Sequence, residues 1–552
     1  MATIDGATLM ARSLKQQHVD YMFGIVGFPV HGIASAAQHE GITYIGMRNE
    51  QAASYAAQAA GYLTGRPQAC LAVSGPGMVH AIAGLANAQA NCWPMLLIGG
   101  ASGVHQNGMG AFQEAPQVQA ALPFCKYAHQ VERTERIPFY VEQAVRTALY
   151  GRPGAAYLDM PDDIINGKVE EADLSPAATV PEPPRTQAMP EDIDAAIAAL
   201  KSAEQPLVII GKGMAWSRAE DEVREFIDRT QLPFLPTPMG KGVVPDDHPL
   251  SVAAARSYAL KNADVVVLLG ARLNWILHFG QPPRYRSDLR VVQLDISPEE
   301  IGTNVPSEVA LLGDGRAIMR QLNQVLEADP WQYPPETTWR TGLANTAEEN
   351  HGVTEQMLND DATPMNYHRA LRDIRDAIPR DAIIVSEGAN TMDIGRTILP
   401  NYEPRTRLDA GTYGTMGVGL GFAIAAAVVD GSRRVVAVEG DSAFGFSGME
   451  VEVACRYRLP ITFVVLNNGG IGGGMTDDLP AGSPLPPMAL GADYHYERVI
   501  EAFGGKGFYV ERPEELKPAL QAAMDSDMPS IVNVVIHPRA GRKPQEFSWL
   551  TT

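Results

Sequence analysis

Short apolar stretches alternate with alanine-rich segments of helical periodicity along almost the whole chain. The alternation falls into three blocks, at about 1–170, 191–345 and 365–540, with apolar runs such as YMFGIVG at 21–27 and ITFVVLNN at 461–468. Apolar runs of this length between helices are typical of buried parallel strands that are joined by helical crossovers. The pattern therefore predicts an α/β fold with three parallel-sheet layers, the second of them Rossmann-like.

The connections between the blocks are marked by proline. The 552-residue chain is too long for one hydrophobic core, so we expect the three blocks to be separate domains. Five prolines within 174–190 prevent a continuous helix or central strand and predict a linker. The stretch 331–364, with prolines and a charged run, predicts the second crossing, and 541–552 forms a basic, aromatic tail.

Charge, hydropathy and cysteine usage exclude several classes of function. The formal charge of −20 carries no basic run, so nucleic acid is a poor candidate partner. No apolar run approaches the roughly 18 residues that would cross a bilayer, so we expect no membrane role. The four cysteines are widely spaced without a CxxC pair, and the N-terminus has no signal-peptide pattern. We therefore expect buried, reduced cysteines and a cytoplasmic protein.

The sharpest local feature is a strand that runs into polar residues. RVVAVEG at 434–440 is followed by Asp441 and Ser442, and Asn468 ends the next strand, before a glycine-rich turn. If the two strand ends are adjacent, a carboxylate, an amide oxygen and a main-chain carbonyl from the turn make an oxygen set suited to Mg²⁺. The glycines let the backbone approach phosphates closely. Taken alone, the GDS tripeptide is as commonly a simple turn.

These residues resemble the GD(G/S)…NN signature of thiamine diphosphate enzymes. The resemblance implies three domains that bind the pyrimidine, form a Rossmann-like centre and bind the diphosphate. It also implies that Asp441, Asn468 and the carbonyl of Gly470 hold Mg²⁺ against the diphosphate. The other cofactor contacts that it implies lie at strand ends and in loops of the third block: Gly388, Asn390, Met416, Gly440, Ser442 and Ile471. Met416 would hold the two rings of the cofactor in a V shape.

An acidic residue in the first block carries the second part of the resemblance. Glu50 follows a short strand and opens the alanine-rich helix of RNEQAASYAAQAAGYLTG at 48–65. A carboxylate favours a helix N-terminus for purely structural reasons. By its RHEQ-like motif, Glu50 instead resembles the buried acid that donates a hydrogen bond to N1′ of the aminopyrimidine. Since Glu50 and the metal ligands lie in different blocks, the family architecture implies a homodimer or homotetramer with shared active sites.

Longer strings resemble the 2-hydroxyacyl-CoA lyases, with oxalyl-CoA decarboxylases as near relatives. They include MGAFQEAPQ at 109–117, SEGANTMDIGRT at 386–397 and GDSAFGFSGMEVE at 440–452. The resemblance implies cleavage of the C1–C2 bond of a CoA thioester to formyl-CoA and an aldehyde or ketone, and the reverse acyloin condensation. Decarboxylases have tyrosines near the substrate carboxylate where this chain has Phe112 and Gly472, which weakens the decarboxylase alternative. A non-catalytic subunit would be expected to lack the glutamate or the metal ligands, which are present.

The sequence leaves open which residue takes the hydroxyl proton of the substrate. Gln113 lies, by resemblance, near the cofactor and would orient the substrate, while His80 carries an imidazole, a group that can act as a base near neutral pH. A lone helix histidine is more often merely packed. Gly472 opens a run of three glycines, which predicts a looser loop and a roomier site than in the lyases that this chain resembles.

Two further clusters lie outside the catalytic motifs. Lys212, Arg272, Asp295 and Asp314 match positions that contact ADP in oxalyl-CoA decarboxylases, with structural ion pairing as the alternative. In the tail, Arg542 and Lys543 lead to the hypothesis of a lid near the phosphates of CoA, with a disordered end as the alternative.

Overall fold

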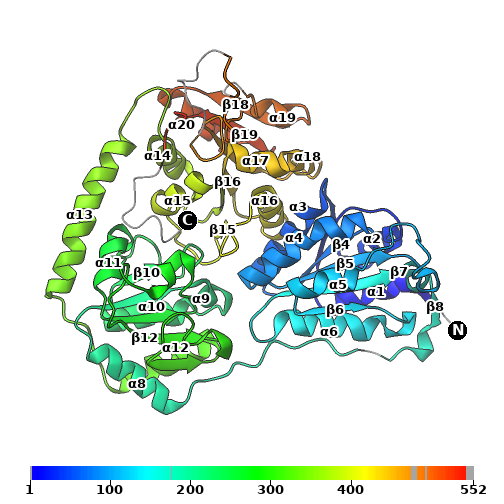
Figure 1. Ribbon diagram of the computed structural model, residues 1–552, viewed down its shortest axis with the longest axis horizontal. Helices are drawn as coiled ribbons and strands as arrows, with labels where there is room; N and C mark the ends of the chain where they lie inside the picture. Colours follow the sequence, from blue (N-terminus) through cyan, green and yellow to red (C-terminus); the bar gives the residue numbers. More distant parts are fainter. Residues whose placement is uncertain (1–2, 176, 474–481, 492–493, 542–552) are drawn as a thin grey trace.

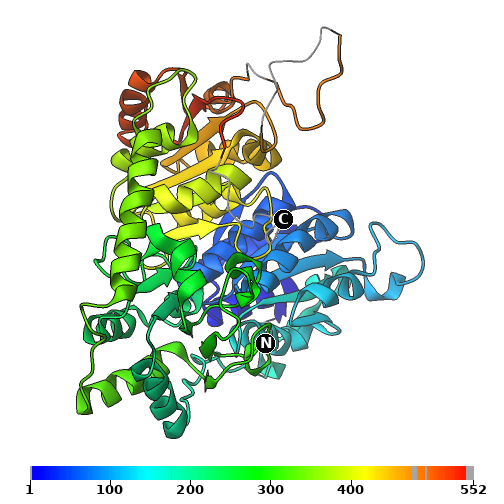
Figure 2. The same cartoon turned by 60° about the vertical axis from the view of Figure 1, so that its left-hand side comes forward.

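The computed structural model describes residues 3–175, 177–473, 482–491 and 494–541. Three parallel sheets with flanking helices form three bodies, coloured blue to cyan, green, and yellow to red along the chain in Figure 1. The turned view of Figure 2 shows the first and third bodies in contact, with the central body below the third. The parallel α/β prediction is therefore confirmed.

The first sheet has six strands in the order β3-β2-β4-β5-β7-β6. Its strands are β2 (Tyr21–Gly24), β3 (Thr43–Gly46), β4 (Gln68–Ala72), β5 (Met95–Ala101), β6 (Tyr127–Gln130) and β7 (Ala155–Pro161). The helices are α1 (Gly6–Gln16), α2 (His31–His39), α3 (Glu50–Thr64), α4 (Pro76–Asn91), α5 (Gln117–Ala121), α6 (Ile137–Leu149) and α7 (Asp162–Ile165). A short antiparallel pair, β1 (Thr3–Asp5) with β8 (Lys168–Glu170), closes this block.

The central sheet has five strands in the order β10-β9-β11-β12-β13. They are β9 (Pro206–Ile210), β10 (Phe234–Pro236), β11 (Val265–Leu269), β12 (Arg290–Asp295) and β13 (Val309–Leu312). The helices of this block are α8 (Pro190–Lys201), α9 (Lys212–Trp216), α10 (Glu220–Thr230), α11 (Arg256–Asn262) and α12 (Gly315–Ala328). The second crossing was predicted only as a proline-bearing connection, but it contains the 21-residue helix α13 (Thr338–Leu358).

The third sheet has six strands in the order β15-β14-β16-β17-β19-β18. They are β14 (Ile383–Glu387), β15 (Arg407–Asp409), β16 (Val435–Gly440), β17 (Ile461–Asn467), β18 (Lys506–Val510) and β19 (Ser530–Val535). Its helices are α14 (Tyr367–Ala377), α15 (Ala389–Ile398), α16 (Gly419–Val429), α17 (Asp441–Ser447), α18 (Val451–Arg456), α19 (Glu497–Glu501) and α20 (Pro513–Met524). The three sheets fall within the ranges predicted for the domains, whose boundaries stay predictions.

The first and third sheets have one topology. When strands are counted in chain order within each sheet, both read second, first, third, fourth, sixth, fifth. Every strand pairing in the two sheets is parallel, so the loops that follow their strands gather at one edge of each sheet. The two blocks are therefore structural relatives, although the sequence shows no internal repeat.

The first and third blocks share one core, in which α3 packs against α16. A Cβ on Gly421 would lie 2.7 Å from the carbonyl oxygen of Ala52, so only glycine allows this close helix contact. The Trp93 ring stacks on Tyr62 at 4.9 Å and meets Phe422 at 5.1 Å, measured between ring centroids. Large aromatic area buried at this contact fixes the two blocks relative to each other.

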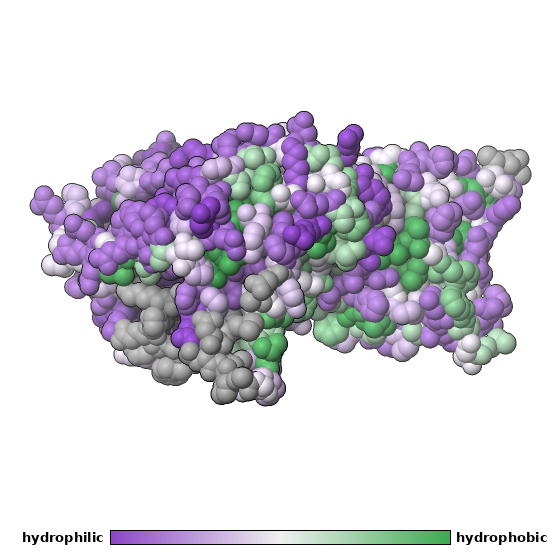
Figure 3. All heavy atoms as spheres, turned by 90° about the horizontal axis from the view of Figure 1, so that it is seen from above, coloured by the Kyte–Doolittle hydropathy of each residue, from purple (hydrophilic) through white to green (hydrophobic). Residues whose placement is uncertain are grey.

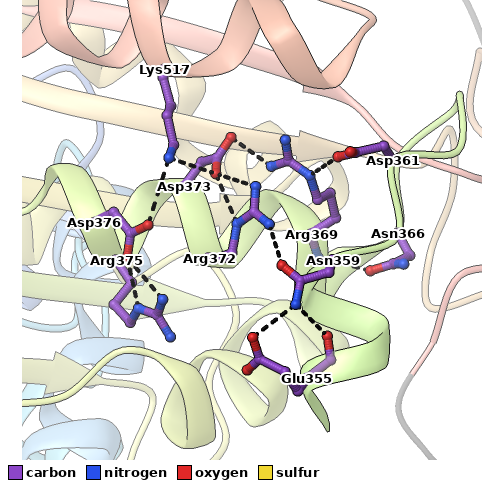
Figure 4. Close-up of polar contacts among 10 residues, drawn as sticks. All are labelled: Glu355, Asn359, Asp361, Asn366, Arg369, Arg372, Asp373, Arg375, Asp376 and Lys517. Atoms are coloured by element: carbon purple, nitrogen blue, oxygen red, sulfur yellow. Dashed lines mark hydrogen bonds and ion pairs between the residues drawn. The ribbon is translucent and has the colours of Figure 1, made fainter. Parts of the chain in front are cut away.

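An ionic cluster links α14 to the chain before it and to α20 in the third block (Figure 4). Asp373 is fully buried and pairs with Arg369 at 2.6 Å, and Arg369 also meets Asp361 at 2.6 Å. Lys517 of α20 reaches Asp373 and Asp376 at 3.8 Å. A buried carboxylate needs such partners, and Arg372, at 3.1 Å, shares the charge of Asp373 with Arg369 and Lys517.

Within the described part of the chain, no helix is long and apolar enough to cross a membrane. The four cysteines are free; Cys70 and Cys455 are buried as expected, whereas Cys92 and Cys125 are partly exposed. On the face shown in Figure 3, exposed hydrophobic residues form patches between hydrophilic ones.

Candidate functional site

The predicted metal ligands meet at one edge of the third sheet. β16 and β17 are neighbours; β16 ends at Gly440, directly before Asp441, and Asn468 directly follows the end of β17. The backbone N–H of Gly470 donates to Oδ2 of Asp441 at 3.1 Å and to Oδ1 of Asn468 at 3.3 Å. Asp441 is 2% and Asn468 4% exposed. The structure therefore brings the three residues together in a largely dry site.

The donor set at this edge fits Mg²⁺. Burial raises the pKa of Asp441 to about 6, against the backbone N–H groups of Ser442, Gly469 and Gly470, which lower it. A bound cation reverses the effect of burial because it favours the ionised carboxylate. Among the described residues no group of three His, Cys, Asp or Glu side chains converges on a metal site. Amide and carbonyl oxygens would therefore complete the set, as Mg²⁺ accepts.

A glycine cradle lies beside these ligands, at the start of α15. Gly388 has a φ of +99°, and a Cβ on it would lie 3.1 Å from the backbone nitrogen of Gly440. No side chain of the described residues caps the first N–H groups of α15, which can therefore bind an anion such as a diphosphate. Asn390 and Asn468 both donate to the carbonyl of Gly472, at 3.2 and 2.8 Å, and so draw the glycine turn toward the cradle.

Residues 411–418, here called the cofactor loop, carry Met416, which is half-buried. The loop leads into α16, as the glycine-rich turn before a buried helix predicts. The Glu387 carboxylate accepts from the backbone N–H groups of Gly417 and Gly419, and burial raises its pKa to about 7. Glu439, its register partner on β16, is also buried. A pair of carboxyls therefore lies beneath the end of the loop.

At the edge of the first sheet, Glu50 begins α3, as predicted. Asn49 caps this helix by accepting from the N–H of Gln51 at 2.7 Å. Nδ1 of His80, on α4, lies 3.3 Å from Oε2 of Glu50. The Glu50 side chain is 14% exposed and that of His80 61%. His80 is therefore not simply packed in the core, and it shares a contact with the predicted cofactor acid.

Gln113 and Phe112 lie on the loop that covers this edge. Oε1 of Gln113 accepts from the hydroxyl of Ser74 at 3.0 Å, which ties the loop to the turn before α4. Phe112 is 66% exposed and meets Phe28 edge to face, with 5.9 Å between the ring centroids. The two rings present an apolar wall without a hydrogen-bond donor for a carboxylate.

A cavity of about 470 Å³ opens at the edge of the central sheet. All four residues predicted to contact a nucleotide line it: Lys212, Arg272, Asp295 and Asp314. Each of them also has a partner within the chain. Arg272 donates to the carbonyl of Ala90 at 3.0 Å, and Lys212 donates to that of Asn91.

The two acids of the cavity are held by arginines from outside the central sheet. Asp295 pairs with Arg152 at 2.9 Å, and Asp314 pairs with Arg185 at 3.0 Å while it caps α12. The alternative of structural ion pairing thus describes contacts that exist. Ion pairing alone does not require a cavity between these residues, so it does not explain why they surround one.

Some predicted residues fall outside the described part of the chain. Arg542 and Lys543, for which a contact with CoA phosphates was predicted, lie there, and so does Gly474 of the glycine run. The remaining predicted residues are all described.

Sequence reasoning missed several residues at these edges. Arg152 comes from the first block, and nothing in its local sequence points to the central cavity. The acid Glu439 carries a signal that could have been used, because it stands in an otherwise apolar strand. Glu450 is buried and accepts from the backbone N–H of Arg48 at 3.2 Å, but its local sequence gives no signal of this contact.

Exposed apolar side chains lie on the segments that carry or adjoin the predicted site residues. In the first block they are Val26, Phe28, Val79, Met109 and Phe112, and in the third block they are Tyr413, Phe446, Met449, Ile471 and Met488. Exposed apolar clusters of this kind are typical of surfaces that another protein surface covers.

Comparison with known proteins agrees with this geometry. Family models described as thiamine pyrophosphate enzyme, N-terminal TPP binding domain, central domain and C-terminal TPP binding domain match residues 4–122, 193–322 and 387–534. The chain is 53% identical to 2-hydroxyacyl-CoA lyase 1 of Homo sapiens, over 99% of this chain and 97% of that protein. It is 45% identical to 2-hydroxyacyl-CoA lyase of Arabidopsis thaliana, over 98% and 96% of the two chains. It is 44% identical to oxalyl-CoA decarboxylase of Escherichia coli (strain K12), over 97% and 96%.

Proposed function

The chain belongs to the thiamine pyrophosphate enzyme family, and from that premise we propose that it is a Mg²⁺-dependent 2-hydroxyacyl-CoA lyase. The reaction cleaves the C1–C2 bond of a 2-hydroxyacyl-CoA to formyl-CoA and an aldehyde or ketone. The reverse reaction joins formyl-CoA to a carbonyl compound. The relatives whose names specify this substrate class support the proposal.

The proposed roles fall to two groups of residues. One lies at the end of the third sheet, with Asp441 and Asn468, and is here called the third edge; the other lies at the end of the first sheet, with Glu50 and His80, and is here called the first edge. Asp441, Asn468 and the Gly470 carbonyl would hold Mg²⁺, and the Gly388 cradle would hold the diphosphate. When bound, thiamine diphosphate supplies a nucleophilic carbon and accepts the electron pair of the broken bond. Met416 would orient its rings.

The first edge would handle protons. Glu50, largely buried, would donate a hydrogen bond to the aminopyrimidine. His80 would accept the proton of the 2-hydroxyl group, since it reaches from Glu50 to solvent and neutral imidazole is a base near pH 7. Gln113 would orient the substrate through its amide, which Ser74 already holds.

The wall of Phe112 and Phe28 is the observation that favours the lyase over the alternative, an oxalyl-CoA decarboxylase. A decarboxylase binds a second carboxylate beside the reacting carbon, and a phenyl ring offers it no hydrogen bond. The same wall suits the alkyl or aryl group of a longer acyl chain.

The discriminating experiment is product analysis, because both reactions release formyl-CoA. The protein, loaded with thiamine diphosphate and Mg²⁺, is offered oxalyl-CoA and a panel of 2-hydroxyacyl-CoAs. We expect an aldehyde or ketone from the panel. Release of CO₂ from oxalyl-CoA, with no aldehyde from any member of the panel, would overturn the proposal.

The active site is proposed to be shared between two subunits of a homodimer or homotetramer. The exposed apolar side chains of the first and third blocks support this arrangement, because they lie on the segments that carry or adjoin the predicted site residues and are suited to a partner. A second copy of the chain would bring the first edge of one subunit to the third edge of the other.

The cavity of the central sheet is proposed to bind ADP. Lys212 and Arg272 would meet the phosphates, and Asp295 at the end of β12 would meet the ribose hydroxyls. Titration calorimetry with ADP tests this. Saturable heat that is lost in Arg272→Ala is expected, and absence of heat with the wild-type protein would contradict it.

A further inference from the structure

The cofactor loop is held from the first block of the same chain by two asparagines of α4. The backbone N–H of Thr412 donates to Oδ1 of Asn91 at 2.8 Å. The hydroxyl of Thr415 donates to Oδ1 of Asn87 at 2.7 Å. Thr415 directly precedes Met416, so the second contact lies next to the residue that is proposed to orient the cofactor.

The two asparagines belong to a buried row of amides, here called the amide ladder: Gln58, Asn87 and Asn91. Nδ2 of Asn91 donates to Oδ1 of Asn87 at 3.1 Å, and Nδ2 of Asn87 donates to Oε1 of Gln58 at 2.8 Å. All three side chains are buried. Side chains four positions apart lie on one face of a helix, which aligns Asn87 and Asn91 toward the loop.

The ladder joins the elements that carry the predicted site residues. Gln58 lies on α3, which begins with Glu50, and Asn87 lies on α4 about two turns after His80. The loop itself has little regular structure, since Gly411, Gly414 and Gly417 all have positive φ. Its position therefore depends on side-chain contacts such as those of the ladder.

The other end of the loop is fixed from the central block. Nη2 of Arg272 donates to the hydroxyl of Thr412 at 3.1 Å, and Nε1 of Trp275 donates to its carbonyl at 2.8 Å. Thr412 is thus held by several groups. At Thr415 the bond to Asn87 is the side-chain contact that can transmit the position of α4 to Met416.

We propose that Asn87 and Asn91 are positioning residues, which set the position of Met416 by tying the cofactor loop to α4 of the same chain. They act through Thr415 and Thr412 and touch neither substrate nor cofactor. The proposal rests on the proposed function only for the role of Met416. A buried amide left without a partner is costly, so the ladder has one favourable arrangement and transmits it to the loop.

The sharpest test uses paired variants of Thr415. Thr415→Val removes the hydroxyl donor at almost constant shape, and Thr415→Ser keeps it. Because Asn87 still accepts from Asn91, the first change leaves no ladder oxygen unpaired. We expect Thr415→Val to lower kcat about tenfold with KM changed less than about twofold, and Thr415→Ser to stay near wild type.

A spectroscopic readout separates positioning from activity. The near-UV circular dichroism of bound thiamine diphosphate reports the orientation of its aminopyrimidine, and calorimetry gives its dissociation constant. In Thr415→Val we expect an altered dichroic band with the dissociation constant within about threefold of wild type. An unchanged band together with an unchanged kcat would overturn the proposal.

A matched control separates a positioning role from the general destabilisation that follows when any buried amide is removed. Asn87→Leu should lower both the thermal midpoint and kcat, the latter by about 10²-fold. Asn323→Leu removes a comparable buried amide in the central block, where Nδ2 donates to the Glu222 carbonyl at 2.9 Å, and should lower the midpoint alone. Equal loss of kcat in both would assign the ladder a purely structural role. If the wild-type protein binds the cofactor but cleaves no 2-hydroxyacyl-CoA, the proposed function fails, while the dichroism of the Thr415 pair still decides the ladder.

Discussion

The first and third sheets have the same strand order, yet different residues follow their equivalent strands. The third strand in chain order leads to Asp441 in the third sheet but to Ser74 and Gly75 in the first. The second strand leads to Glu50 in the first sheet and to the cofactor loop in the third. One framework thus carries the proposed metal ligands and the proposed phosphate-binding N–H groups in one block, and an acid, a histidine and an apolar wall in the other. The chemistry resides in the loops, while the sheets fix where the loops meet.

Removal of the third edge's carboxylate should have the largest effect. Asp441→Ala takes away a proposed Mg²⁺ ligand, and a catalytic metal contributes several kcal/mol, so activity should fall at least about 10³-fold. Calorimetry should also show weaker binding of thiamine diphosphate with Mg²⁺. Asp430→Ala, which removes a partly exposed carboxylate of the same block that pairs with Arg433, is the control and should keep metal binding. Normal Mg²⁺ dependence in Asp441→Ala would contradict the assignment of this edge.

Removal of the first edge's acid should spare binding and affect turnover. Glu50→Gln keeps the shape of the side chain but changes what it can donate, so kcat should fall about 10³-fold, within the range of acid–base catalysis. Calorimetry should find the cofactor still bound. A loss of affinity as large as that of Asp441→Ala would mean that the two edges do not divide the work.

His80 tests the first edge more finely. His80→Ala should lower kcat by about 10²-fold if His80 takes the hydroxyl proton. His80→Gln, which keeps a polar partner for Glu50, should not restore the rate, because an amide is no base. A near-normal kcat in either variant would exclude this role for His80.

Gly472 tests how roomy the third edge is. Its φ is +73°, and no atom of the described residues lies within 4 Å of a Cβ placed on it, so Gly472→Tyr has space among them but costs about 1–2 kcal/mol of backbone strain. The condensation rate with bulky carbonyl substrates should fall a few-fold, which narrows the range of substrates that the enzyme accepts. Gly472→Asn carries a side chain that tolerates positive φ and serves as the control. An unchanged substrate range would refute the predicted role of the glycine run.

The strands and helices that could be predicted from the sequence are those with a continuous apolar run or a clear apolar periodicity. The strands before Asp441 and Asn468 are continuous apolar runs, and the ends of adjacent parallel strands converge, so their meeting could be predicted. Helix α13 was missed because it buries few side chains, among them Trp339 and Leu343, and so has little apolar periodicity.

Contacts between distant parts of the chain were not predicted. The bond from Thr415 to Asn87 spans 328 positions, and that from Arg152 to Asp295 spans 143. A single sequence carries no information on such pairs, since an asparagine on a helix looks alike whether it faces solvent or a loop of another block. The amide ladder and the arginines of the central cavity therefore required the structure.

The central claim is that the first edge of one subunit and the third edge of another form one active site. The most direct measurement is the activity of a purified heterodimer of one Glu50→Gln chain and one Asp441→Ala chain, isolated through two different tags. A shared site predicts one intact and one doubly altered site, and therefore about half of the wild-type rate. A heterodimer as inactive as either parent would contradict the claim, because each chain would then carry its whole site alone.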